Sequence, residues 1–151
     1  MLSAKRALLP AVLAGVISIA VPHATTADRP VERALNDIRV SASRAPLQYS
    51  TVLERVARRH AEDISRRRAL SHIGADGSRV SHRASAEGYP WCQIAENVAW
   101  GQQNLDQVMR DWKRSPSHRR AMLSANVVEF GLARADGDFW VMVLARPGCT
   151  D

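Results

Sequence analysis

The chain has 151 residues, of which 46% are hydrophobic and 24% are charged. This composition is typical of a globular domain, and it excludes a disordered chain or a multi-pass membrane protein. Twenty-one lysines and arginines against fifteen acidic residues give a formal charge of +6, which raises the hypothesis of an anionic partner.

The N-terminus has the pattern of a secretory signal peptide. Lys5 and Arg6 precede an apolar run at residues 7–21, and small residues follow it. The run is shorter than the roughly 20 residues that a membrane-spanning helix needs. We therefore predict a signal peptide at residues 1–27 and a single domain at residues 28–151. The protein is expected to be secreted, extracellular or periplasmic, with no transmembrane helix in the mature chain.

Loss of the signal peptide lowers the charge. It takes away two basic and no acidic residues, so nineteen basic and fifteen acidic residues remain, a net charge of +4. Most basic residues alternate with acidic ones, which is typical of solvated helix faces. The alternative is that an uninterrupted run of three arginines forms a binding site for an anionic polymer. Because an exported chain does not meet intracellular nucleic acid, this polymer would be one of the cell envelope. These candidate residues are Arg66, Arg67 and Arg68.

Three helices are predicted in the first half of the mature chain. Apolar residues at helical spacing predict a helix over residues 31–39. A stripe of apolar residues, which includes His60, predicts an amphipathic helix from Thr51 to Leu70 with arginines on its outer face. After a loop that begins at His72, a short helix is expected from Arg79 to Glu87. We expect His60 to lie in the core.

Two more helices follow. Asn104 and Gln107 form a predicted capping box for a helix whose apolar face is Leu105, Val108, Met109 and Trp112. Ser115 with a proline after it predicts the start of another short helix, which runs through Leu123 and has His118 in its first turn.

The C-terminal part predicts a β-hairpin. Residues 127–135 and 139–145 are rich in β-branched and aromatic residues, and Asp136-Gly137-Asp138 between them is a turn sequence. Helices followed by a terminal antiparallel hairpin favour an α+β domain over a parallel doubly wound one.

The cysteine content points to one disulfide. Cys92 and Cys149 are the only cysteines, and an exported chain favours a bond between them. Closing a loop of this length would stabilise the fold by about 4 kcal/mol. Two buried thiols are the alternative.

The sequence carries no motif of the common enzyme classes. G-x-S-x-G, H-E-x-x-H, the P-loop and G-x-G-x-x-G are all absent. His72, Glu96 and His118 remain as scattered candidates. Two imidazoles and one carboxylate suit zinc or a similar divalent cation, and without a metal they could act as a general base. Histidines in purely structural roles are the alternative.

These residues and their order resemble the CAP superfamily, which groups cysteine-rich secretory proteins, antigen 5 and plant pathogenesis-related proteins. The pattern is similar to its bacterial secreted branch and covers about Leu35 to Leu144. It is carried by Asn36-x-x-Arg39, Ser71-His72, Gly88-Tyr89, Glu96-Asn97, Trp112, Ser-Pro-Ser-His at 115–118, Met122-Leu123, Gly131 and Trp140.

The resemblance implies an α-β-α sandwich, in which a central antiparallel sheet lies between helices beside an open cleft. His72, Glu96 and His118 match the cleft residues of the family. The fourth cleft position is commonly glutamate and is Ser115 here, which puts a four-ligand metal site in doubt. Trp100 is a candidate platform for sugar or lipid at the cleft edge.

We expect a monomeric binding or interaction module of the cell envelope or the extracellular space. Its cleft could take zinc or another divalent cation, and its candidate ligands are a lipid, a glycan or a cell-wall component. A metal- or base-assisted hydrolase, either a protease or a cell-wall hydrolase, that uses His72, Glu96 and His118 as catalytic residues is the first alternative. An arginine-rich binder of anionic polymers is the second.

Overall fold

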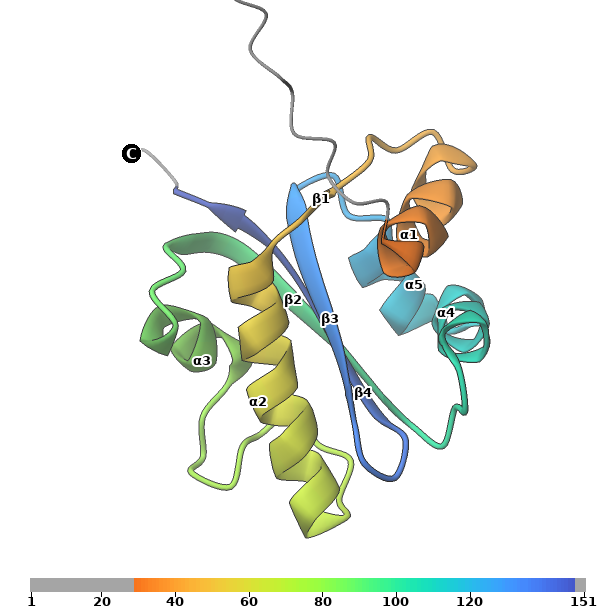
Figure 1. Ribbon diagram of the computed structural model, residues 1–151. Helices are drawn as coiled ribbons and strands as arrows, with labels where there is room; N and C mark the ends of the chain where they lie inside the picture. The colour runs from red at the N-terminus through yellow and green to blue at the C-terminus, as the bar shows by residue number, and fades with distance from the viewer. Residues whose placement is uncertain (1–28, 149–151) are drawn as a thin grey trace, which may run out of the picture.

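A central sheet separates two layers of helices in the computed structural model, which describes residues 29–148 (Figure 1). The helices are α1 (Pro30–Val40), α2 (Thr51–Arg67), α3 (Val80–Ala86), α4 (Leu105–Arg114) and α5 (Pro116–Met122). Helices α2 and α3 lie on one face of the sheet, and α1, α4 and α5 lie on the other. The predicted α+β class and α-β-α sandwich are therefore confirmed. The predicted signal peptide lies outside the described residues.

The sheet has four strands in the order β1-β3-β4-β2. The strands are β1 (Gln48–Tyr49), β2 (Trp91–Trp100), β3 (Glu129–Ala135) and β4 (Phe139–Pro147). The three long strands pair antiparallel, as predicted for the central sheet, whereas the two-residue β1 runs parallel to β3. This order leaves β2 at an edge of the sheet.

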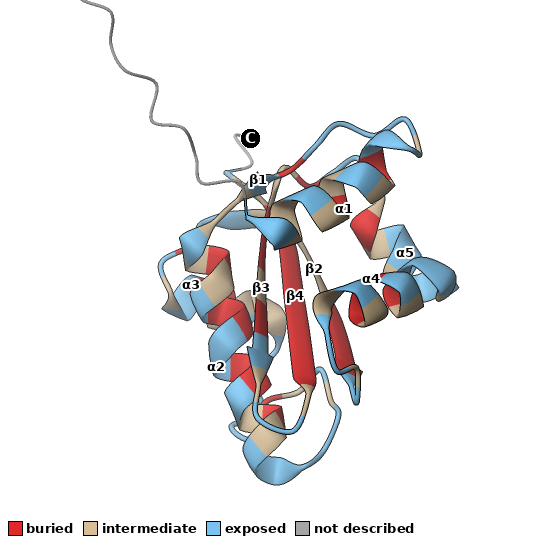
Figure 2. Ribbon diagram, turned by 45° about the vertical axis from the view of Figure 1, so that its right-hand side comes forward, coloured by how far each residue is buried: buried red, intermediate tan, exposed pale blue. Residues whose placement is uncertain are grey.

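The amphipathic stripe of α2 accounts for one half of the core. Its apolar residues are buried and pack on β3 and β4 (Figure 2). Ser50 caps the helix by accepting a hydrogen bond from the Leu53 amide at 3.4 Å. The helix ends at Arg67, earlier than the predicted Leu70, because Arg68 adopts a left-handed backbone with φ 48°. Within residues 29–148, no helix is long and apolar enough to cross a membrane.

Strand β4 joins the two halves of the core, since both of its faces are buried. Val141 and Val143 belong to the cluster under α2, whereas Met142 and Leu144 belong to the cluster under α1 and α4, which also holds Trp112. This alternation follows from the two-residue period of a strand.

The predicted helix starts and the hairpin are largely confirmed. Asn104 accepts a hydrogen bond from the Gln107 amide at 2.9 Å, but the Gln107 side chain accepts from Gln103, so the capping box is only half formed. Helix α5 begins directly after Ser115. In the hairpin turn, Gly137 has φ 76°, and the residue after it also has a positive φ, which suits the turn sequence.

Strand β2 is the long strand that the sequence patterns do not predict. Trp91 is its first residue and is 39% exposed. The end of β4 lies beside the start of β2, where the Gly148 amide donates to the Pro90 carbonyl at 2.8 Å. Cys149 lies outside the described residues, so its disulfide with Cys92 stays a prediction.

Candidate functional site

Strand β2 places Glu96 at the centre of a polar network. Glu96 pairs with Val143 of β4, and its side chain, only 3% exposed, faces the layer of α2 and α3. One carboxylate oxygen, Oε1, accepts a hydrogen bond from His72 Nδ1 at 2.9 Å. The other oxygen, Oε2, accepts from Arg83 Nη2 at 2.7 Å. A buried carboxylate with two charge-assisted partners is firmly oriented.

Arg83 is the residue of this network that sequence analysis missed. It projects from α3 and also donates to the backbone carbonyls of Ser78, at 2.7 Å, and His72, at 3.4 Å. Arg83 therefore fixes the loop between α2 and α3 against β2. Its position in a short basic segment gives no sequence signal, because the contact depends on how α3 folds back toward Glu96.

The hydrogen bond to Glu96 determines which ring nitrogen of His72 carries a proton, and it also raises the pKa of the ring. A carboxylate only accepts, so Nδ1 of His72 carries the proton, and Nε2 is the ring nitrogen left for other partners. The same bond raises the pKa of His72 against the opposing effect of burial. The His72 side chain is 56% exposed. The arrangement thus presents an oriented, basic imidazole to solvent.

His60 of α2 borders the network, with its Nε2 3.9 Å from Glu96 Oε1. It is buried, as predicted, and its Nε2 lies 2.8 Å from the Ser71 carbonyl, which can only accept a hydrogen bond. Burial lowers the pKa of His60, so the ring is neutral with its proton on Nε2. Its Nδ1 has no hydrogen-bond partner within residues 29–148.

The histidines make opposite contributions to stability as the pH changes. Burial lowers the pKa of His60 below its ordinary value of about 6.5, so the stability linked to it is present above that pH and is lost as the pH falls. The raised pKa of His72 gives stability below about pH 6.5 that is lost as the pH rises through the folded-state pKa.

We expect His60→Gln to flatten the loss of stability between about pH 6.5 and 5, since glutamine can still donate to Ser71 but does not titrate. His72→Gln should flatten the change above about pH 6.5 instead. Urea unfolding of both variants and the wild type across this range measures the effect. Parallel pH curves for the wild type and His60→Gln would contradict the assignment.

His118 lies near this network but does not contact Glu96. It is in the first turn of α5, as predicted, and its carbonyl accepts from Asn97 Nδ2 at 3.2 Å. Burial, and then the charge of His72, lower the pKa of His118. The structure therefore joins His72 to Glu96 directly and sets His118 apart. Ser115 begins α5, and its hydroxyl lies 3.3 Å from that of Ser117.

These positions do not form a three-ligand cation site around Glu96. Across the described residues, no three histidine, cysteine or acidic side chains gather where a metal ion could bind. Both oxygens of Glu96 are engaged, and the guanidinium of Arg83 would repel a cation. Glu96 is placed to orient His72, and cation binding stays a prediction.

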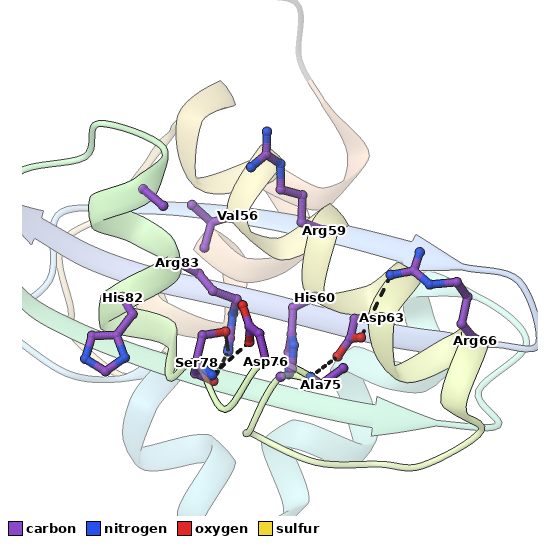
Figure 3. Close-up of a pocket in the computed structure, with 12 residues that line it drawn as sticks. Val56, Arg59, His60, Asp63, Arg66, Ala75, Asp76, Ser78, His82 and Arg83 are labelled. Atoms are coloured by element: carbon purple, nitrogen blue, oxygen red, sulfur yellow. Dashed lines mark hydrogen bonds and ion pairs between the residues drawn. The ribbon is translucent and has the colours of Figure 1, made fainter.

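Two hollows flank the network. The first, of about 370 Å³, is called here the His72 hollow; its walls include His72, Glu96, Trp91, Arg79, Ser81 and Ile94. The second, of about 460 Å³, lies between α2, α3 and the loop that joins them (Figure 3). Arg83 and His60 reach into this second hollow from the two helices, so the network forms a wall shared by both spaces.

The two exposed tryptophans occupy different places, and Trp100 does not have its predicted role at the cleft edge. Trp100 stacks on Phe139, with ring centroids 5.4 Å apart, and donates to the Gly137 carbonyl at 3.0 Å. It therefore covers the hairpin turn and does not line the His72 hollow. Trp91 lines that hollow, and its Nε1 is fixed by a 3.0 Å hydrogen bond to the Ser85 hydroxyl.

The arginine run at the end of α2 is largely paired. Arg67 Nη2 lies 2.8 Å from Asp63 Oδ2 and donates to the Ile73 carbonyl at 2.9 Å. Arg66 lies 3.8 Å from the same carboxylate, and Arg68 forms the left-handed cap. The sharing of Asp63 weakens the positive field that the sequence alone indicates.

A family comparison matches most of the chain. The profile of CAP, the cysteine-rich secretory protein family, matches residues 32–144. The uncharacterized protein YkwD of Bacillus subtilis is 25% identical over 96 residues, which make up 63% of this chain and 37% of that protein. The chain thus spans little more than a third of that relative.

Three solved structures share the fold. An extracellular protein with an SCP domain from Bacillus anthracis has a TM-score of 0.74 at 20% identity, over 77% of this chain and 39% of that one. An outer surface protein of Borrelia burgdorferi has a TM-score of 0.71 at 21% identity, over 78% of this chain and 90% of that one. A cysteine-rich secretory protein of Staphylococcus aureus has a TM-score of 0.65 at 16% identity, over 76% of this chain and 36% of that one. Sequence profile and fold agree, and the chain belongs to the CAP family.

Proposed function

We propose that this CAP domain is a secreted binding module, active in the cell envelope or outside the cell, and that it holds a glycan in the His72 hollow. Export is supported by the predicted signal peptide and by similar structures that are described as an extracellular protein and an outer surface protein. The choice of ligand rests on the walls of the hollow.

The observation that carries the proposal is that Trp91 and His72 line one hollow. Sugar rings have apolar C–H faces that pack on an indole, and hydroxyl groups that exchange hydrogen bonds with polar side chains. Trp91 supplies a fixed indole, and the free Nε2 of His72 can accept from a hydroxyl. Arg79 and Ser81 add donors at the same hollow.

The contacts of His72 favour binding over nucleophilic catalysis. A catalytic nucleophile lies within hydrogen-bond reach of its base. Among the described residues, no hydroxyl or thiol side chain is bonded to the His72 ring, and the neighbouring Ser71 hydroxyl accepts from the Ile73 amide at 2.9 Å. The oriented imidazole is therefore available to a ligand.

We expect Trp91→Ala to weaken binding of soluble peptidoglycan fragments by about tenfold, the value of one lost aromatic contact. His72→Ala should weaken it by a similar factor. Trp100→Ala is the matched control, because this indole is also exposed but lies outside the hollow. Calorimetric titration measures the affinities, and circular dichroism checks that each variant is folded.

Equal losses in Trp91→Ala and Trp100→Ala would show that the hollow is not the site. The absence of saturable binding by the wild type would overturn the glycan proposal. Cleavage of the fragments by the wild type, abolished in His72→Ala, would support the hydrolase alternative instead.

A further inference from the structure

A third hollow, remote from the Glu96 network, has a strongly basic wall. It has a volume of about 610 Å³ and lies between the loop after α1 and the end of α5. We call it the arginine hollow; its walls include Arg44, Arg119, Arg120, Leu123, Ser124 and Asn126. None of the acidic residues that the structure describes lines it. It shares no residue with the His72 hollow, so it is independent of the proposed function.

The three arginines of this hollow lack counter-charges. All three are exposed, and none forms an ion pair with another of residues 29–148. They contrast with Arg66 and Arg67, which share Asp63. Three unpaired cations on one concave surface produce a local positive potential that attracts anions.

A buried cation beneath the hollow strengthens this potential. Arg39 of α1 is only 2% exposed, and its guanidinium donates to the carbonyls of Ala45, Met122 and Ser124 at 2.8, 2.6 and 3.0 Å. All three partners are neutral, so they satisfy its hydrogen bonds without neutralising its charge. Burial, and then the charge of Arg44, lower the pKa of Arg39, as expected where no anion is close.

Arg39 also fixes the shape of the hollow. Ala45 follows Arg44 in the loop after α1, whereas Met122 and Ser124 belong to the end of α5 and the residues after it. One buried guanidinium therefore holds together the two segments that carry the exposed arginines. A preformed cradle of this kind loses little conformational freedom when a ligand binds.

We propose that the arginine hollow binds a phosphate group. Guanidinium groups bind phosphate oxygens through paired, charge-assisted hydrogen bonds, and arginines from two segments can approach one phosphate from different sides. Pro116 and Leu123 also line the hollow, and a carbon substituent on the phosphate can pack on their apolar atoms. Free phosphate and the headgroup of an anionic lipid share this chemistry.

The test compares two triple variants with equal loss of charge. R44Q/R119Q/R120Q removes the arginines of the hollow, and R66Q/R67Q/R68Q removes three from α2 as the control. The purified mature chain, residues 28–151, is titrated with inorganic phosphate, followed by calorimetry, and with phosphatidylcholine vesicles that contain phosphatidylglycerol, followed by co-sedimentation. Thermal unfolding checks that both variants remain folded.

We expect R44Q/R119Q/R120Q to lose at least about thirtyfold in affinity, and the control to lose less than about threefold. Salt should weaken the wild-type interaction steeply. Saturable binding of inorganic phosphate identifies the free ion as sufficient, and binding of the vesicles alone identifies a lipid headgroup. Binding of neither probe, or equal losses in the two triple variants, overturns the proposal.

Discussion

Gly131→Ala is expected to lower the free energy of unfolding by at least about 3 kcal/mol. A Cβ atom at this position of β3 would lie 2.1 Å from the Glu54 amide nitrogen and 2.3 Å from the Leu53 carbonyl carbon. Both are backbone atoms of α2, so no side chain can move aside. The helix would have to separate from the sheet, which would open the cluster of buried residues between them.

Gly77→Ala is the matched control for this prediction. Gly77 has φ 78°, and a Cβ there would meet no heavy atom within 4 Å, so only the backbone strain of about 1 kcal/mol applies. Urea unfolding of both variants measures the difference. If Gly131→Ala costs no more than Gly77→Ala, the close approach of α2 and β3 is not what makes glycine necessary.

The fold is predictable where one face of an element is buried. The stripe of α2, the proline start of α5 and the turn at Gly137 each have local physical causes that the sequence displays. Strand β2 lacks such a pattern. It is an edge strand, and its consecutive polar residues Glu96 and Asn97 point to opposite faces of the sheet, where each contacts a helical layer or its loop. The two-residue β1 is too short for any pattern.

The site is predictable only in part. His72 and Glu96 are expected together from the resemblance, and the structure joins them by one hydrogen bond. The role of Arg83 cannot be predicted from the sequence, because its contact with Glu96 depends on how the α2–α3 loop and α3 fold back onto β2. His60 carries a weak signal, since a titratable ring on an apolar stripe must find a polar partner when buried.

Arg83 gives the second large effect, because it is the charged partner of a buried carboxylate. Arg83→Met should lower the free energy of unfolding by about 3 to 5 kcal/mol at neutral pH. The 2.7 Å bond to Glu96 is lost, and the carboxylate, only 3% exposed, retains His72 as its hydrogen-bonded partner. Methionine fills a similar volume, so the loss reports mainly on charge and hydrogen bonding.

A double-mutant cycle separates the ion pair from the other contacts of Arg83. Arg83 also holds the Ser78 carbonyl, so part of the loss will persist when Glu96 is neutral. We expect Arg83→Met to cost at least about 2 kcal/mol less in the Glu96→Gln background than in the wild type.

In Arg83→Met alone, protonated His72 should partly replace the missing charge. The stability of this variant should therefore be lower at pH 8 than at pH 6, because His72, whose pKa the hydrogen bond to Glu96 raises above its ordinary value of about 6.5, loses this charge as the pH rises. Urea unfolding of the four proteins at both pH values tests these expectations, and equal costs in the two backgrounds would rule out the buried ion pair as the link between α3 and β2.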